Sequence, residues 1–200
     1  MISSWVREQN KEQGKENDQT NFSINIDGVA KNYTTSDGVI FLGGKNVVGL
    51  TGSVSGATSF SDLMEIRNET DGKIFIYTQN NSASEYSIGM SGNYTKLTNN
   101  GGIYLGIIPG TTVISDTVSG FTGINSNTDS SKNLNFIGMY GIGTKLENYS
   151  IISDRPTNTL TNNSEKGIGM YGKKSNYSGS ISNNGTINIG LKGIGILGEG

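Results

Sequence analysis

The sequence predicts an all-β protein, built as a right-handed parallel β-helix whose coils differ in length. A short phrase, Ile-Gly-Met/Ile-x-Gly, recurs at residues 88–92, 137–141, 168–172 and 194–198. A second phrase, Asn-Asn-Gly followed by alternating apolar residues, is clearest at 183–189. Only 32% of the residues are hydrophobic, while 30 are glycine. This composition suits a repeat fold, in which each turn buries a thin apolar stripe against its neighbours.

Residues 1–20 differ from the remainder and are expected to be a polar lead-in, either helical or disordered. Gln, Glu, Lys and Asn dominate between Arg7 and Gln19, and Trp5 is the only large apolar residue that could anchor the segment. A mixed run of charges is typical of a solvated segment. The apolar stretch before Arg7 is too short for the core of a signal peptide, so none is predicted in this chain.

Short strands are predicted from residue 21 onward. Apolar and polar residues alternate over 22–26, which indicates a strand with one buried face. Asp-Gly pairs at 27–28 and 37–38 predict turns. Apolar runs at 39–42 and 47–50 predict two more strands, each closed by glycine.

The last third shows the coil most clearly. Residues 167–172 form one predicted strand, 183–185 a corner, 186–189 a second strand and 193–198 a third. Asn and Gly suit corners because both tolerate a positive φ. Weaker copies of the corner phrase occur at 99–105 and 71–76.

Period two predicts which side chains point into the coil. In the strand at 186–189, Ile187 and Ile189 should point inward, and Thr186 and Asn188 should face solvent. In the glycine-containing strands the expected inward residues are Ile168, Met170, Ile194 and Ile196. The intervening Gly169 and Gly195 should leave the opposite face bare.

The spacing of the glycine phrases is irregular. Counted from Ile88, Ile137, Ile168 and Ile194, it is 49, 31 and 26 residues. A propeller or a leucine-rich repeat keeps a stricter period, whereas loops of any length can leave the corner of a β-helix. At roughly 20–30 residues per coil, residues 21–200 would form about seven coils. No polar cap follows Gly198, so this segment is expected to be incomplete at its C-terminus and prone to self-association there.

Composition excludes several kinds of chemistry. The chain has no Cys and no His, which removes thiolate zinc sites, cysteine nucleophiles and Ser-His-Asp triads. With a formal net charge of −2 it lacks the basic surface that nucleic-acid binding requires. No apolar run approaches the length of a membrane-spanning helix, so no membrane insertion by this segment is expected.

Paired carboxylates are the remaining catalytic candidates, because glycoside hydrolases use two acids across one bond. The candidates are Asp62 with Glu65, Asp154 beside Arg155, and the isolated Asp116 and Asp129. They are scattered and never stand two on one short strand, so we interpret them as solvated loop acids. No catalytic, cofactor-binding or metal-binding residue is assigned, and no cofactor is expected.

Tyrosine is the most informative side chain for binding. Tyr140 and Tyr171 occupy the same place in two copies of the glycine phrase. Further tyrosines nearby are Tyr86, Tyr94, Tyr104, Tyr149 and Tyr177. Such rings could stack on sugars or anchor a protein partner, but we predict that they form a ladder of stacked rings along the solenoid.

The phrases at 167–172, 181–190 and 193–196 resemble the passenger domains of large autotransporters, in particular the Asn/Gly/Ile-rich adhesins of anaerobic Gram-negative bacteria. The resemblance covers roughly residues 68–200 and is weaker over 20–67. It implies a parallel β-helix secreted by the type V route through a carboxy-terminal β-barrel and displayed on the outer membrane. The motif is structural, so the resemblance transfers no catalytic residue.

The expected function is therefore a non-enzymatic segment of a cell-surface passenger, acting as a stalk or as an adhesion surface. The expected partner is a protein or glycan on a host or bacterial cell, reached through a longer parent protein of which this chain would be a fragment. Two alternatives remain: a β-helix polysaccharide lyase or hydrolase, and a segment of a phage tail spike.

Overall fold

The computed structural model describes residues 20–26, 29–35, 39–43, 46–55, 64–77, 86–109, 113–114, 121–123, 135–154, 166–175, 179–190 and 193–200. All regular secondary structure in these ranges is β, and no helix occurs among them. The prediction of an all-β fold is confirmed. The lead-in predicted for residues 1–20 lies, apart from Thr20, outside the described residues.

Fourteen of the strands form three parallel sheets. The glycine sheet contains β4 (Val48–Ser53), β7 (Ser87–Asn93), β13 (Asn135–Ile142), β16 (Lys166–Lys173) and β19 (Ile194–Glu199). The asparagine sheet contains β5 (Met64–Asn68), β8 (Thr95–Asn99), β14 (Lys145–Asn148) and β17 (Ser180–Asn183). The third sheet contains β3 (Val39–Gly43), β6 (Lys73–Tyr77), β9 (Gly102–Leu105), β15 (Ile151–Ser153) and β18 (Thr186–Asn188).

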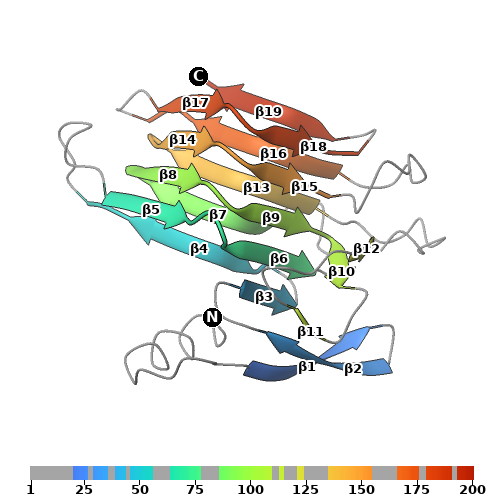
Figure 1. The fold of residues 1–200 in the computed structure, drawn as a ribbon. Coiled ribbons are helices and arrows are strands. Elements are labelled where there is room, and N and C mark those ends of the chain that lie inside the picture. The colour runs from blue at the N-terminus through green and yellow to red at the C-terminus, as the bar shows by residue number, and fades with distance from the viewer. Residues whose placement is uncertain are drawn as a thin grey trace.

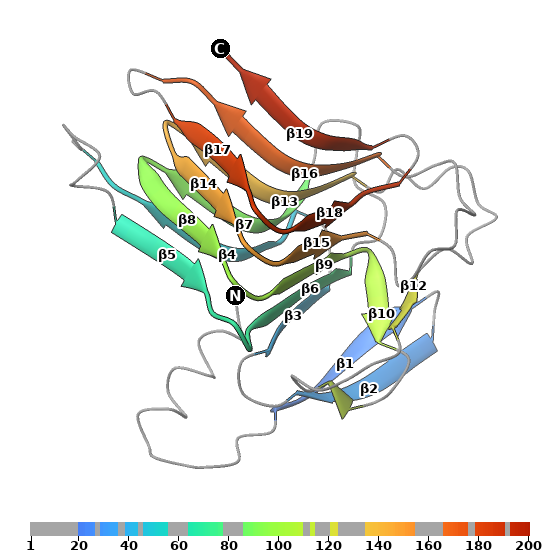
Figure 2. The same cartoon turned by 45° about the horizontal axis from the view of Figure 1, so that its top comes forward.

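The chain visits these sheets in a fixed rotation, from the third sheet to the glycine sheet to the asparagine sheet and back (Figure 1). Equivalent strands of successive turns therefore pair in parallel, and equivalent residues meet. Ile137 pairs with both Ile88 and Ile168, and Leu146 pairs with both Leu97 and Ile181. Figure 2 shows the turns stacked along one axis, an arrangement that is consistent with a parallel β-helix.

Two smaller sheets lie outside this stack. β1 (Thr20–Ile26) and β2 (Val29–Thr35) pair antiparallel, and β11 (Val113–Ile114) pairs with β2. β10 (Ile107–Pro109) pairs antiparallel with β12 (Phe121–Gly123). The glycine sheet consequently has five strands, fewer than the about seven coils expected from length, because these segments contribute no strand to the three parallel sheets.

The core is a set of apolar rows that run along the stack. The glycine sheet contributes Met90, Met139 and Met170, the asparagine sheet Leu97 and Leu146, and the third sheet Ile74, Ile103 and Ile152; all eight are 0% exposed. Ile187 and Ile189 pack against this core, which confirms their predicted inward orientation. The predicted corner at 183–185 is also confirmed, because it separates β17 from β18.

Three side chains that the sequence predicts to point inward are not fully buried: Ile168, Ile194 and Ile196. Ile194 and Ile196 are 44% and 49% exposed, because β19 is the last strand of the glycine sheet and no described strand covers it. Ile168 is half-buried and lies outside the core cluster.

The glycines of the repeat also have a different role from the predicted one. A Cβ at Gly169 would lie 2.4 Å from Cγ2 of Ile187 and 2.5 Å from the carbonyl oxygen of Gly195. Glycine therefore does not merely leave the outer face bare. It allows the isoleucine of the third sheet and the next strand of its own sheet to approach closely.

Candidate functional site

Of the acidic candidates, the structure describes Glu65 and Asp154. Asp62, Asp116, Asp129 and Arg155 lie outside the described residues. Asp154 is only 3% exposed, and its Oδ2 accepts a hydrogen bond of 3.0 Å from the backbone N–H of Gly190. The prediction of a solvated loop acid is thus wrong for Asp154, because this carboxylate fixes the segment that follows β18. Within the described ranges, no three His, Cys, Asp or Glu side chains are placed to hold a metal ion.

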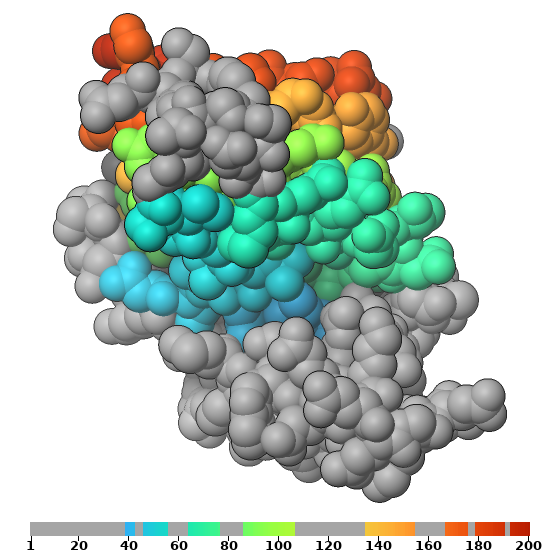
Figure 3. All heavy atoms as spheres, turned by 90° about the vertical axis from the view of Figure 1, so that its left-hand side faces the viewer, coloured from blue at the N-terminus to red at the C-terminus, as the bar shows by residue number. Residues whose placement is uncertain are grey.

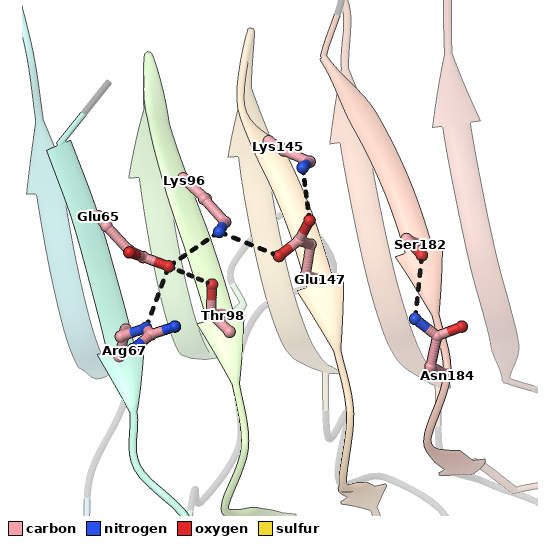
Figure 4. A network of polar contacts seen from close by, with 8 residues as sticks. All are labelled: Glu65, Arg67, Lys96, Thr98, Lys145, Glu147, Ser182 and Asn184. Atoms are coloured by element: carbon pink, nitrogen blue, oxygen red, sulfur yellow. Dashed lines mark hydrogen bonds and ion pairs between the residues drawn. The ribbon is translucent and has the colours of Figure 1, made fainter. Parts of the chain in front are cut away.

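Glu65 instead belongs to a charged cluster on the outer face of the asparagine sheet. Alternation along β5, β8 and β14 turns Ile66, Leu97 and Leu146 toward the core and their neighbours outward. The parallel register then aligns Glu65 with Lys96 and Lys145, and in a second row Arg67 with Thr98 and Glu147. We refer to these six residues as the charged cluster (Figure 4).

Lys96 lies between the two acids of the cluster and contacts both. Nζ of Lys96 lies 3.0 Å from Oε1 of Glu65 and 3.3 Å from Oε2 of Glu147. Lys145 contributes a contact of 2.6 Å to Oε1 of Glu147, and Nε of Arg67 lies 3.1 Å from Glu65. Thr98 donates to Glu65 at 2.9 Å. The charged cluster ends at β14, because the neighbouring strand β17 has Ser180 and Ser182 at the equivalent positions of the two rows.

These contacts shift the ionisation of the two acids. The hydrogen bond from Lys96 is the largest influence on Glu65 and holds its pKa below the usual value of 4.5. For Glu147 burial is the largest single influence and opposes ionisation, but hydrogen bonds from Lys145 and Lys96 outweigh it, so its pKa is also lowered. Both carboxylates are therefore held ionised, which suits a structural ion-pair network better than proton transfer.

We expect Glu147→Gln to lower the free energy of unfolding by about 1 kcal/mol near neutral pH, because the side chain of Glu147 is only 9% exposed. A carboxylate with a lowered folded-state pKa stabilises the fold above its unfolded pKa of 4.5 and loses that contribution as pH falls through the folded value. Urea unfolding between pH 7 and pH 3 should therefore show a smaller acid loss in the variant than in the wild type. Glu69→Gln, at an exposed position, is the control; an equal change there would contradict this role of Glu147.

Beneath the charged cluster, four asparagines form a continuous hydrogen-bonded ladder. Nδ2 of Asn68 donates to Oδ1 of Asn99 at 2.8 Å, Asn99 to Asn148 at 2.7 Å, and Asn148 to Asn183 at 2.7 Å. Asn99 and Asn148 are 0% exposed. The ladder was missed from the sequence, although a signal is present: in each of these strands an Asn follows two residues after the inward Ile or Leu.

Tyr140 and Tyr171 lie next to each other as predicted, with ring centroids 5.2 Å apart, but their rings are tilted by 56° rather than stacked. The hydroxyl of Tyr171 donates to Glu199, and this bond raises the pKa of Tyr171 to about 12. Tyr104 belongs to a different stack, with Phe75 at 4.9 Å and then Phe41. Tyr149 is 49% exposed, and Tyr177 lies outside the described residues.

A cleft of about 390 Å³ opens at the end of the stack, between β19 and β17. We call it the end cleft. Its lining residues are Thr144, Gly172, Lys173, Lys174, Gly179, Ser180, Ile181, Gly198, Glu199 and Gly200. No sequence motif indicated this cleft, because its lining residues lie far apart in the chain, mainly on β16, β17 and β19.

The described surface of the asparagine sheet is built from rows of side chains that run along the stack. Figure 3 shows the coils following one another in chain order along one side of the molecule. In such rows, similar side chains recur on successive strands along the stack. A rigid spacer or an extended contact surface can be built in this way.

No helix in the described part of the chain combines the length and the hydrophobicity needed to cross a membrane. Comparisons with protein-family models, with curated proteins and with solved structures find no match to this chain.

Proposed function

We propose that this chain is a non-enzymatic segment of an autotransporter passenger, displayed on the surface of a Gram-negative bacterium as a stalk or as an adhesion surface. The observation that carries the proposal is the stacking of coils in one register, with repeated apolar, asparagine and charged rows. Such a stack is rigid and extends in one direction by adding coils, which is what a surface stalk requires. The partner in adhesion would be a protein or a glycan of another cell.

We further propose that the coil is a right-handed parallel β-helix. Crossovers between parallel strands of one sheet are right-handed in nearly all proteins, because a right-handed strand twist leads the chain back onto the sheet in that sense. The three parallel sheets and their fixed order of visits support this reading.

Surface location is tested by shaving intact cells of the source bacterium with protease and detecting this segment with an antibody against the purified chain. The proposal expects the signal to disappear from intact cells while a cytoplasmic marker stays. Retention of the signal until the cells are permeabilised would overturn it.

Adhesion is tested separately with beads coated with the purified chain, against cells and against a glycan array. If the segment is a stalk, the coated beads should bind cells and glycans no better than beads coated with an unrelated β-protein. If it is an adhesion surface, the coated beads should show saturable binding. Release of reducing or unsaturated ends from polysaccharides by the same protein would instead favour the lyase or hydrolase alternative.

A further inference from the structure

Two strands of the asparagine sheet carry an acidic and a basic side chain on the outer face, in opposite orders. Along β5 the order is Glu65 and then Arg67, and along β14 it is Lys145 and then Glu147. The side chains of Glu65, Arg67 and Lys145 are 35%, 48% and 41% exposed (Figure 4). These three charges therefore reach the surface, although each also contacts a neighbour in its own chain.

The other two strands of this sheet complete the two rows without adding like charges. On β8 the positions are filled by Lys96 and Thr98, and on β17 by Ser180 and Ser182. The side chain of Lys96 is 29% exposed, whereas Thr98 is small and only 2% exposed. No strand of the sheet thus places two charges of the same sign in the two rows.

This pattern is complementary to itself when the two rows are exchanged. A two-fold axis that runs along the stack, in front of the face and midway between the rows, performs this exchange and keeps every strand at its own height. Glu65 of one copy then faces Arg67 of the second copy, and Lys145 faces Glu147. Lys96 faces the small side chain of Thr98. Across such a contact, no two side chains of like charge face each other.

A two-fold axis that runs along the strands gives a poorer match. If the axis passes over β8, Glu65 faces Lys145 but Lys96 faces Lys96 of the second copy. If it passes between β8 and β14, Lys96 faces Lys145 in both halves of the contact. Like charges placed directly opposite each other are destabilising. The charge pattern therefore favours the axis along the stack.

We infer that the outer face of the asparagine sheet is a contact between two copies of this chain, which lie side by side with their stacks pointing in the same direction. Most of the attraction comes from Glu65 and Arg67. The side chain of Glu147 is only 9% exposed and is already held by two lysines. The contact goes beyond the proposed function, because it joins neighbouring copies laterally, whatever the segment binds.

The size of the face sets the strength of this contact. Four strands spaced by about 4.8 Å and five residues long span about 19 Å by 16 Å, or about 300 Å² for each copy. Stable complexes bury about 800 Å² on each partner. The association is therefore weak, and because it depends on exposed charges it should weaken further as the salt concentration rises.

Sedimentation velocity of the purified full chain tests the inference, at protein concentrations up to about 1 mM in low salt and again in about 0.5 M salt. We expect a monomer–dimer equilibrium in low salt that shifts to monomer in high salt. Glu65→Lys and Arg67→Glu each place like charges opposite each other across the contact. Each variant alone should self-associate at least about tenfold more weakly than the wild type, with an unchanged circular dichroism spectrum.

An equimolar mixture of these two variants should form dimers again. In the mixed dimer, the introduced lysine of one variant faces the introduced glutamate of the other, and the native Arg67 and Glu65 face each other. A mixture of Glu65→Lys with Lys145→Glu should not associate, because its rescue requires the axis along the strands. Recovery in the first mixture also shows that the single variants are folded.

The control variant is Glu69→Lys, which makes the same change of charge at an exposed position outside the two rows. It should associate as the wild type does.

Four results would overturn the inference. The wild type could remain monomeric at about 1 mM. Glu65→Lys and Arg67→Glu could each associate as strongly as the wild type, which would place the contact on another surface. The mixture of these two variants could associate no better than either alone. Rescue could instead occur in the mixture with Lys145→Glu, in which case the stacks point in opposite directions.

Discussion

Gly138→Ala is expected to lower the free energy of unfolding by about 3 kcal/mol, which is a large share of the stability of a small domain. The added Cβ would lie 2.4 Å from Cγ2 of Ile152 and 2.5 Å from the carbonyl oxygen of Gly169. Ile152 is 0% exposed, and Gly169 lies within the parallel ladder between β13 and β16. Neither neighbour can move away without loss of core packing or of strand pairing. Urea unfolding followed by circular dichroism measures the effect.

Gly195→Ala is the matched control, because Gly195 occupies the same place in the last copy of the phrase and its Cβ would meet nothing within 4 Å. We expect this variant to stay within about 0.5 kcal/mol of the wild type. Equal losses in the two variants would show that glycine acts through backbone conformation alone, and would contradict the close-approach role assigned to Gly138.

The single variant Asn148→Ala is also expected to lower the free energy of unfolding by about 3 kcal/mol. Urea unfolding followed by circular dichroism again measures the effect. Asn148 is 0% exposed and links three coils of the ladder, accepting from Asn99 and donating to Asn183, both at 2.7 Å. It also donates to the carbonyl of Ser150 at 3.0 Å. Alanine would leave the buried amide of Asn99 without its acceptor, and each buried polar group left unsatisfied costs about 1–3 kcal/mol.

The comparison variant is Asn184→Ala, adjacent to the ladder but exposed, with a bond of 3.5 Å to Ser182 (Figure 4). It should change stability by less than about 0.5 kcal/mol. A loss for Asn148→Ala no greater than that for Asn184→Ala would mean that the ladder contributes nothing to the fold.

The elements that could be read from the sequence are those set by local rules. The apolar run at 39–42 becomes β3, and the Asn-Asn-Gly phrase at 183–185 becomes a corner, because alternation and turn chemistry act within a few residues. The sequence also predicted that Tyr140 and Tyr171 are neighbours, because residues at equivalent positions of a repeat pair once the coils stack.

The features that were missed depend on register between distant strands. Asn68, Asn99 and Asn148 form a ladder only because β5, β8 and β14 align without a shift. The pairing of Lys96 with Glu65 and Glu147 has the same origin, and no single strand carries that information. The inward role of Gly169 was missed because it depends on Ile187, which lies in another sheet.

The alternation of inward and outward side chains along a strand could not predict the exposure of Ile194 and Ile196 either. The alternation of β19 repeats that of β16, where Met170 is 0% exposed, and only the place of β19 at the end of the sheet distinguishes them. Burial of a repeat strand thus depends on its neighbours on both sides.

Register is therefore the central claim, and engineered disulfides test it most directly because the chain contains no Cys. Lys145 and Ser180 are register partners on the asparagine sheet. Their Cα atoms should stand about 4.8 Å apart, within disulfide range. Lys96 and Ser180 stand two strands apart, at about 9.6 Å, which is beyond that range. We expect rapid oxidation of the Lys145→Cys/Ser180→Cys pair and no oxidation of the Lys96→Cys/Ser180→Cys pair. Cross-linking of the second pair in preference to the first would contradict the stacked register.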